Sequence, residues 1–366
     1  MRKIKIILNP NAGKNRRGGS RTALTKIIEA LNEKNIAFEV VPTNFPGEAK
    51  ILAKKASEDK TLGLLLVIGG DGTINEAING LINSDLPLGI IPAGSLNCAA
   101  REMGISSNPK KAIYQLLDGD VKTIHLGKIA FNKNPPISPF GNPPFPPLPK
   151  GDIGGLKGDL QVKERYFLLM AGIGLDAKAV VDFNPRLKKI IGPLAYVWSG
   201  LKQIFTKNHP ILKIESSPAP CVSTQVSEGK CHLEPTWGGA SQKIINGYSC
   251  VINKLKTYAW FNFAPEAGIE KDFFQMFIYK KNDILSLIRY GIGGMFGWHR
   301  HVPSLDRSSK PGTWHRKFSD VESHLVKNVK ITSNETVYIQ ADGEAAGILP
   351  VEISIIPNAI KILLPK

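Results

Sequence analysis

The residues best suited to chemistry lie in GGDGT, at positions 69–73, directly after the apolar run LGLLLVI. Glycines in a turn between strand and helix let the backbone approach a ligand closely, because they carry no side chain and tolerate positive φ. The free amides and the positive dipole at the start of the next helix favour phosphate. A carboxylate at the tip of this turn, Asp71, is suited to contact phosphates through Mg²⁺. The pattern therefore predicts a phosphate-binding turn.

Two further turns have the same setting. NPNAGKNRR (9–17) follows the apolar run KIKIIL and carries Lys14, and PAGSLN (92–97) follows LGII. Neither is a P-loop, because the pattern GxxxxGK[ST] is absent. If all three turns follow strands of one parallel sheet, they meet at its carboxyl edge, where such sheets bind ligands. The sequence therefore predicts a single nucleotide site built from three turns.

The elements that position these turns change character near residue 120. Before it, we expect strands at 3–10, 37–43, 62–70 and 87–92, with helices at 20–34 and 47–57 and from about 73, 95 and 109. Single helices between strands are typical of a parallel sheet covered on both faces. Beyond it we expect short strands at 121–131, 165–174, 211–216, 247–253, 274–280, 329–333, 336–344 and 351–357, with one helix at about 186–206. These predict an antiparallel second domain.

The predicted organisation is an α/β domain at 1–120 followed by a β-rich domain at 121–366. The final apolar run, AIKILLP, is a candidate strand that returns towards the first domain. Two segments interrupt the second domain. The one at about 133–163 is crowded with Pro and Gly, and the one at about 216–243 is polar, so both are expected to be loop insertions.

The composition indicates which classes of partner the protein could bind. The net charge of +16 and the pI near 9.6 favour polyanions, including anionic lipid surfaces. No aromatic-rich basic motif indicates nucleic-acid binding, and we expect none. The four cysteines form no CxxC pair, which indicates free thiols in a reducing compartment. Without an apolar run of about 18 residues or a signal peptide, the chain is expected to be cytoplasmic and to rest on the inner face of the membrane.

Taken in order along the chain, several motifs resemble those of the diacylglycerol kinase catalytic-domain family, which includes bacterial lipid kinases and is related to sphingosine and ceramide kinases. The motifs are NPNAGK, GGDGTINEAINGL, PAGSLNCAARE, AGIGLDA, GPLAYVWSGL and QADGEAAGILPVEISIIPNAIKILLP. GGDGT alone is less specific, because NAD kinases share it. The resemblance implies a nucleotide-binding α/β domain, a β-sandwich-like domain, and an active site in the cleft between them.

The resemblance also implies roles for individual residues. Glu344 is expected to be the catalytic base, with Asp71 as a second catalytic residue that helps to hold Mg²⁺. Asp272 is expected to contribute to a structural metal site. The residues expected to bind ATP are Asn9, Pro10, Asn11, Gly13, Lys14, Thr43, Gly70, Gly72, Thr73, Asn75, Glu76 and Ser95. Two positions depart from the family pattern: Cys98 replaces an acid, and Phe273 replaces a glycine.

The function expected from these motifs is transfer of the γ-phosphoryl group of ATP to a hydroxyl of diacylglycerol or a related lipid at a membrane surface. Three alternatives stay open: a sphingoid-type lipid kinase, an NAD kinase, and a pseudokinase that binds nucleotide without turnover. Cys98 and Phe273 are the reason to keep the last. The sequence does not identify the lipid or the oligomeric state.

Overall fold

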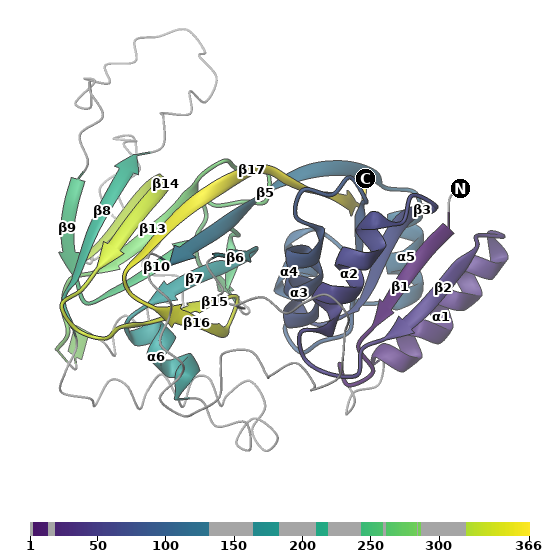
Figure 1. The fold of residues 1–366 in the computed structure, drawn as a ribbon, viewed down its shortest axis with the longest axis horizontal. Helices are drawn as coiled ribbons and strands as arrows, with labels where there is room; N and C mark the ends of the chain where they lie inside the picture. Colours follow the sequence, from purple (N-terminus) through teal and green to yellow (C-terminus); the bar gives the residue numbers. More distant parts are fainter. Residues whose placement is uncertain are drawn as a thin grey trace, which may run out of the picture.

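The computed structural model describes residues 3–13, 19–131, 164–182, 210–218, 243–258, 261–283, 285–286 and 320–366 (Figure 1). The insertion expected at 133–163 and the helix expected at 186–206 lie outside the described residues, as does nearly all of the insertion at 216–243. Within the described part of the chain, no helix is both long and apolar enough to span a membrane.

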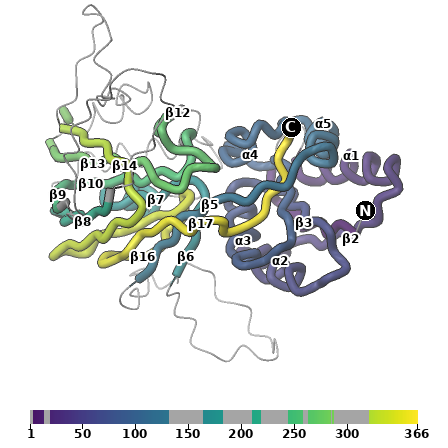
Figure 2. The backbone as a smooth tube through the Cα atoms, turned by 90° about the horizontal axis from the view of Figure 1, so that it is seen from above, coloured from purple at the N-terminus to yellow at the C-terminus, as the bar shows by residue number. Residues whose placement is uncertain are grey.

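The first part of the chain forms a parallel sheet with helices on both faces. Its strands are β1 (Lys3–Leu8), β2 (Phe38–Pro42), β3 (Leu62–Gly69) and β4 (Leu88–Pro92), in the order β4-β3-β1-β2. The helices are α1 (Ser20–Glu33), α2 (Glu48–Glu58), α3 (Asp71–Leu81), α4 (Cys98–Glu102) and α5 (Pro109–Leu117). Figure 2 shows α1 and α5 on one face and α2 and α3 on the other, which explains why β3 is apolar along almost its whole length.

The second part is antiparallel, as the short alternating runs predict. Its elements are β5 (Asp120–Phe131), β6 (Glu164–Phe167), β7 (Met170–Ile173), α6 (Leu175–Val181), β8 (Leu212–Pro218), β9 (Lys243–Gly247), β10 (Ser249–Asn253), β11 (Thr257–Tyr258), β12 (Phe261–Asn262), β13 (Phe274–Tyr279), β14 (Val321–Thr332), β15 (Tyr338–Ala341), β16 (Glu344–Ile348) and β17 (Val351–Leu364). The order β16-β15-β7-β10-β13-β14-β17 encloses a second apolar core.

The last strand, β17, connects the two parts. It pairs antiparallel with β5 from Val351 to Leu364, and Ile362 pairs parallel with Leu88 of β4. Two segments predicted as separate strands, 351–357 and AIKILLP, are therefore one strand with a register shift, and Asn358 within the shift has φ 51°. The predicted fold class, α/β followed by an antiparallel part, is confirmed. The predicted division near residue 120 stays a prediction.

One predicted strand is wrong in a way that matters for the site. Residues 165–174 were expected to form one strand, but the chain bends at Leu168 and Leu169, between β6 and β7. At this bend the backbone amides of Leu168, Leu169 and Met170 donate to the carboxylate of Asp342. A side chain from elsewhere in the sequence takes over these donors, so an apolar run that suits a continuous strand is divided into two.

Candidate active site

The three glycine-containing turns meet at the carboxyl edge of the parallel sheet. A Cβ atom added to Gly94 would lie 2.5 Å from the Cα atom of Gly70, and one added to Gly13 would lie 2.5 Å from the Ala93 carbonyl oxygen. The Ala93 amide also donates to the Gly69 carbonyl over 2.8 Å. Backbones this close leave no room for side chains, so the turns expose their own backbone groups at a shared edge.

A side chain of the turn after β1 contacts the GGDGT turn, which follows β3. The Nδ2 atom of Asn9 donates to Oγ1 of Thr73 over 2.8 Å, and Oδ1 of Asn9 accepts from the Asn11 amide over 3.0 Å. Thr43, which follows β2, is buried, and its amide donates to the Leu8 carbonyl. Asn9, Asn11 and Thr73, together with Pro10, lie in the first two of the three predicted turns, whereas Thr43 lies after β2, outside those turns. Lys14 lies outside the described residues, and Ser95 is exposed in the turn before α4.

Helix α3 begins at Asp71, and Gly70 is its N-cap residue. No side chain of the described residues caps this N-terminus by a hydrogen bond. The Asp71 carboxylate turns to the neighbouring helix instead. Its two oxygens accept from the amides of Cys98 and Ala99, each over 3.1 Å. Burial raises the pKa of Asp71, while these amides and the charge of Arg101 oppose the shift. Asp71 therefore fixes α4 against the GGDGT turn. Its expected role in Mg²⁺ binding stays a prediction.

Glu76 has a similar structural contact. Its Oε1 and Oε2 atoms accept from the amides of Gly47 and Ala49, over 2.9 and 3.2 Å, at the start of α2. Burial raises the pKa of Glu76, and these hydrogen bonds oppose the shift. Because each carboxylate oxygen accepts an amide, Glu76 holds α2 against α3. Its expected role in ATP binding stays a prediction.

Glu344 is the acid that faces the start of α3. It is the first residue of β16, after a tight turn in which Asp342 and Gly343 have φ of 53° and 83°. Its Oε1 atom lies over Gly72, since a Cβ atom added there would be 3.1 Å from this oxygen. Its Oε2 atom accepts from Nη2 of Arg165 over 2.8 Å. With its side chain 49% exposed, Glu344 is accessible and lies beside the GGDGT turn.

Arg165 is a site residue that the sequence analysis missed. It is buried in β6, and its Nη1 atom donates to the Ala345 carbonyl over 3.0 Å. Arg165 therefore links β6 to β16 through two contacts. Among the described strands, β6 pairs with β5 alone and β16 pairs with β15 alone. The sequence does contain an indication of this role, because Arg165 is a charged residue at the start of the apolar run RYFLLM. A buried arginine needs a hydrogen-bonding or charged partner.

Asp342 holds the turn that presents Glu344. Its Oδ1 atom accepts from the amides of Leu169 and Met170, over 2.8 and 3.0 Å, and Oδ2 accepts from the Leu168 amide over 2.9 Å. Oδ2 also accepts from Nδ2 of Asn75 on α3 over 2.5 Å. Burial raises the pKa of Asp342 to about 6, against the opposing effect of these amides. One carboxylate thus joins the Glu344 turn, the bend before β7 and helix α3.

The other side of this turn is held by Gln340. Its Oε1 atom accepts from the Gly343 amide over 2.8 Å, and its Nε2 atom donates to Oδ2 of Asp176 over 2.6 Å. Gln340 is fully buried, and burial raises the pKa of Asp176. Asp176 belongs to the AGIGLDA motif, so this motif supports the position of Glu344 through Gln340.

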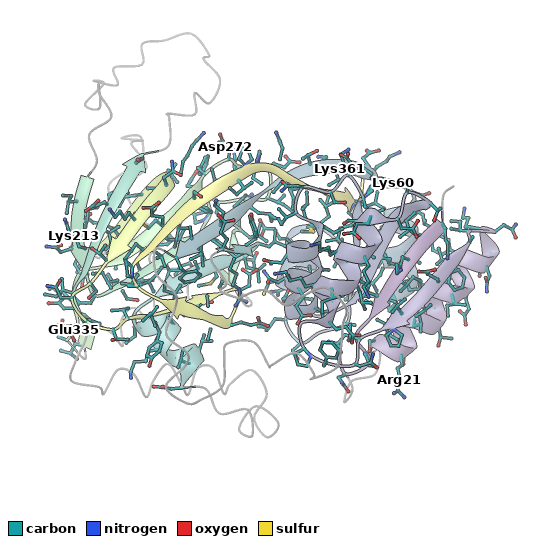
Figure 3. All side chains as sticks on the ribbon, viewed as in Figure 1. Arg21, Lys60, Lys213, Asp272, Glu335 and Lys361 are labelled. Carbon is teal, nitrogen blue, oxygen red and sulfur yellow. The ribbon has the colours of Figure 1, made fainter. Side chains whose placement is uncertain are left out.

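The residues around Asp272 do not fit the expected metal site. Asp272 forms an ion pair with Lys327, and its side chain is about half exposed. Among the described residues, no group of three or more His, Cys, Asp or Glu side chains could hold a metal ion. Figure 3 places Asp272 along the edge of the molecule that carries Lys361 and Lys60, and Lys60 precedes the amino end of β3. Asp272 is therefore remote from the carboxyl edge where the turns meet.

Comparison with known proteins agrees with the motifs. Residues 3–129 match the sequence profile described as diacylglycerol kinase catalytic domain. The match covers about a third of the chain, and over that part the chain is similar to this family. Over its whole length it is 24% identical to a diacylglycerol kinase of Bacillus subtilis, of which 97% is covered, and 22% identical to one of Staphylococcus carnosus, of which 96% is covered.

A solved structure shares the fold. The crystal structure of a diacylglycerol kinase from Bacillus anthracis superposes with a TM-score of 0.61 at 18% identity, covering 99% of this chain and 97% of that one. This structure shows that the fold is shared, while the resemblance inferred from the motifs is confirmed by the profile match and the sequence relatives.

We predict that Asp342→Ala destabilises the protein by about 3 kcal/mol or more, because four donors lose a buried acceptor and each unsatisfied group costs roughly 1–3 kcal/mol. Urea denaturation followed by circular dichroism measures the loss. Asp120→Ala, which changes an exposed acid, is the control and should alter stability by no more than about 0.5 kcal/mol. Equal stability of the two variants would contradict the role given to Asp342.

We predict that Asp71→Asn lowers the free energy of unfolding by about 1–2 kcal/mol, because asparagine keeps one acceptor oxygen but turns an amide group towards the second donor of α4. The same denaturation experiment applies. Asp85→Asn is a suitable control, since the Asp85 side chain is 95% exposed. An unchanged unfolding transition would show that α4 does not depend on Asp71.

Proposed function

We propose that this protein is a lipid kinase that transfers the γ-phosphoryl group of ATP to a hydroxyl of diacylglycerol or a related lipid. The observation that carries the proposal is the position of Glu344, whose Oε1 atom lies over Gly72 at the uncapped start of α3. A helix N-terminus favours phosphate, and a carboxylate accepts a proton from an alcohol. An anion-binding helix end and a general base thus face one another from the two parts of the chain.

The division of roles follows from the contacts. The turns that contain Gly13, Gly70 and Gly94 expose backbone close to one another, so they would bind the phosphates of ATP. Glu344 would accept the proton of the lipid hydroxyl as that oxygen attacks the γ-phosphorus, while the bond from the γ-phosphorus to the bridging oxygen breaks and ADP leaves. Phosphoryl transfer depends chiefly on positioning and on stabilising spread negative charge, which suits a site built from fixed backbone groups.

The donor set at this edge also fits Mg²⁺. The accessible carboxylate of Glu344 lies beside the turn, and Asp71 is in the turn itself, although both Asp71 oxygens already accept amides. Mg²⁺ binds through one or two carboxylates together with phosphate oxygens. When bound, it would neutralise charge on the phosphates.

The acceptor is proposed to be a lipid because residues 3–129 match the diacylglycerol kinase catalytic domain and because two relatives similar over the whole chain are named diacylglycerol kinases. The net charge of +16 favours anionic bilayers, at roughly 1 kcal/mol for each well-placed basic residue. We therefore propose that the protein is cytoplasmic and acts while resting on the membrane surface.

The direct test is to incubate the purified protein with labelled ATP, Mg²⁺ and mixed vesicles. Diacylglycerol, sphingosine and ceramide are offered in parallel, with NAD as the soluble alternative acceptor. Label in diacylglycerol is the expected result. Label in sphingosine or ceramide would favour a sphingoid-type kinase, and label only in NAD would overturn the lipid proposal. Binding of ATP without any labelled product would indicate a pseudokinase.

Replacing the proposed base separates chemistry from nucleotide binding. We predict that Glu344→Gln lowers turnover by about 10²–10⁴, the usual contribution of a general base. The glutamine oxygen can still accept from Arg165, so ATP affinity, measured by calorimetry, should stay within about twofold. Glu335→Gln is the control, since Glu335 lies at the far end of the molecule in Figure 3. Parallel loss of ATP binding and turnover would point to a nucleotide or metal role for Glu344.

The contact between Gly72 and Glu344 provides a second test. In Gly72→Ala the new Cβ atom would crowd Oε1 of Glu344 at 3.1 Å, while alanine suits the helical backbone. We predict at least about a tenfold loss of turnover without loss of stability, because small displacements of a reacting group are costly.

A double-mutant cycle controls for other effects of the new methyl group. In the Glu344→Gln background, Gly72→Ala should cost little further activity. An equal loss in both backgrounds would show that Gly72 acts on phosphate and not through Glu344.

A further inference from the structure

The loop between β12 and β13 is closed around a buried lysine. Lys254 follows β10 and has no exposed surface. Its Nζ atom donates to the carbonyl oxygens of Gly268 and Ile269, over 2.6 and 3.3 Å. Its own carbonyl oxygen accepts from the Gly268 amide over 3.1 Å. Backbone and side chain of Lys254 therefore both hold the segment that ends at Asp272.

The oxygens that could bind a metal in this loop are already engaged. The Gly268 carbonyl accepts from Nζ of Lys254 and also from the Lys271 amide, over 3.0 Å, which uses both of its lone pairs. Oδ2 of Asp272, the acid expected to contribute to a metal site, accepts from Lys327. Two amino groups thus engage the carbonyl oxygens of Gly268 and Ile269 and one oxygen of Asp272, which are the kinds of ligand that a divalent cation would use.

Nearby charge further disfavours a metal ion. The segment 268–272 lies beside Lys254 and Lys327, and Glu270 in its middle is paired with Lys122. A divalent cation would enter among three amino groups, and most of the neighbouring carboxylate charge is already neutralised by them. Burial is also costly for an amino group unless it is hydrogen-bonded, and Lys254 meets this requirement through the two carbonyl oxygens.

We infer that the Lys254 amino group takes the place of a structural metal ion in this chain, and that the loop ending at Asp272 binds no divalent cation. The expectation of a metal at Asp272 is thereby replaced by an internal substitute. The inference does not depend on the proposed kinase activity, because it concerns the loop and not the carboxyl edge of the sheet.

The backbone of this lysine also lies next to the bend that holds Asp342. The Lys254 amide donates to the Leu169 carbonyl over 2.9 Å, and the Leu169 amide donates to Asp342 over 2.8 Å. The donors are backbone amides, so this contact places the loop beside the β6–β7 bend independently of the Lys254 side chain.

The test measures Mn²⁺ binding to nucleotide-free, full-length protein by electron paramagnetic resonance, together with thermal melting in EDTA and in excess MgCl₂. Asp272→Asn and Glu344→Gln are compared with the wild type, because only the first removes the acid of the loop. The expected result is that Asp272→Asn does not change Mn²⁺ binding and that EDTA does not lower the melting temperature. A bound Mn²⁺ that is lost in Asp272→Asn and kept in Glu344→Gln would overturn the inference.

A second variant tests the lysine itself. Lys254→Met keeps the apolar stem and removes the donor, so its melting temperature should fall by several degrees in both EDTA and MgCl₂. Lys256→Met is the matched control, an exposed lysine in the same segment, and should melt like the wild type. An unchanged melting temperature in Lys254→Met would contradict the inference. If this variant does not fold, the Mn²⁺ comparison with Asp272→Asn still decides.

Discussion

The geometry of the site depends on one buried carboxylate. Asp342 accepts three consecutive backbone amides from the β6–β7 bend and a side-chain amide from α3. Each of these donors would be costly to leave unpaired in the interior, so the carboxylate has to be present for the bend and α3 to pack as they do. Glu344 lies two residues after Asp342 in the sequence. Its position relative to the start of α3 is therefore a consequence of an interaction that spans both parts of the chain.

A second constraint is the close approach of glycine backbones. Gly94 lies so near Gly70 that a Cβ atom on Gly94 would be 2.5 Å from the Gly70 Cα atom, and Gly13 adopts φ 65° against Ala93. Because the turns pack on one another, their exposed amides keep fixed directions. Asp71 and Glu76 reinforce this arrangement by holding the first amides of α4 and α2. Acids in the phosphate motif thus build the surroundings of the site as well as its electrostatics.

The sequence predicts the elements whose determinants are local. β1 and β3 are buried apolar runs, the turns after them contain glycine, and the DG pair before Glu344 forms the expected tight turn. The features that the sequence could not predict depend on contacts between residues that are far apart in the chain. The division of residues 165–174 depends on Asp342, and the ion pair of Arg165 joins residues 179 positions apart. A charge pattern shows that Arg165 and Lys254 need partners, but only the fold supplies them.

Negative charge would accumulate where Glu344 meets a bound phosphate. Glu344 already lies at the helix end that would bind phosphate, and two unit charges of the same sign 4 Å apart repel by about 4 kcal/mol at an effective dielectric of 20. Arg165 lies beside Glu344 but is already paired with it. Burial, and after it the charge of Arg165, lowers the pKa of Lys50 on α2. Because the Arg165 charge is already paired with Glu344, a phosphate beside this carboxylate would need further positive charge, which is a physical reason to expect that a divalent cation arrives with the nucleotide.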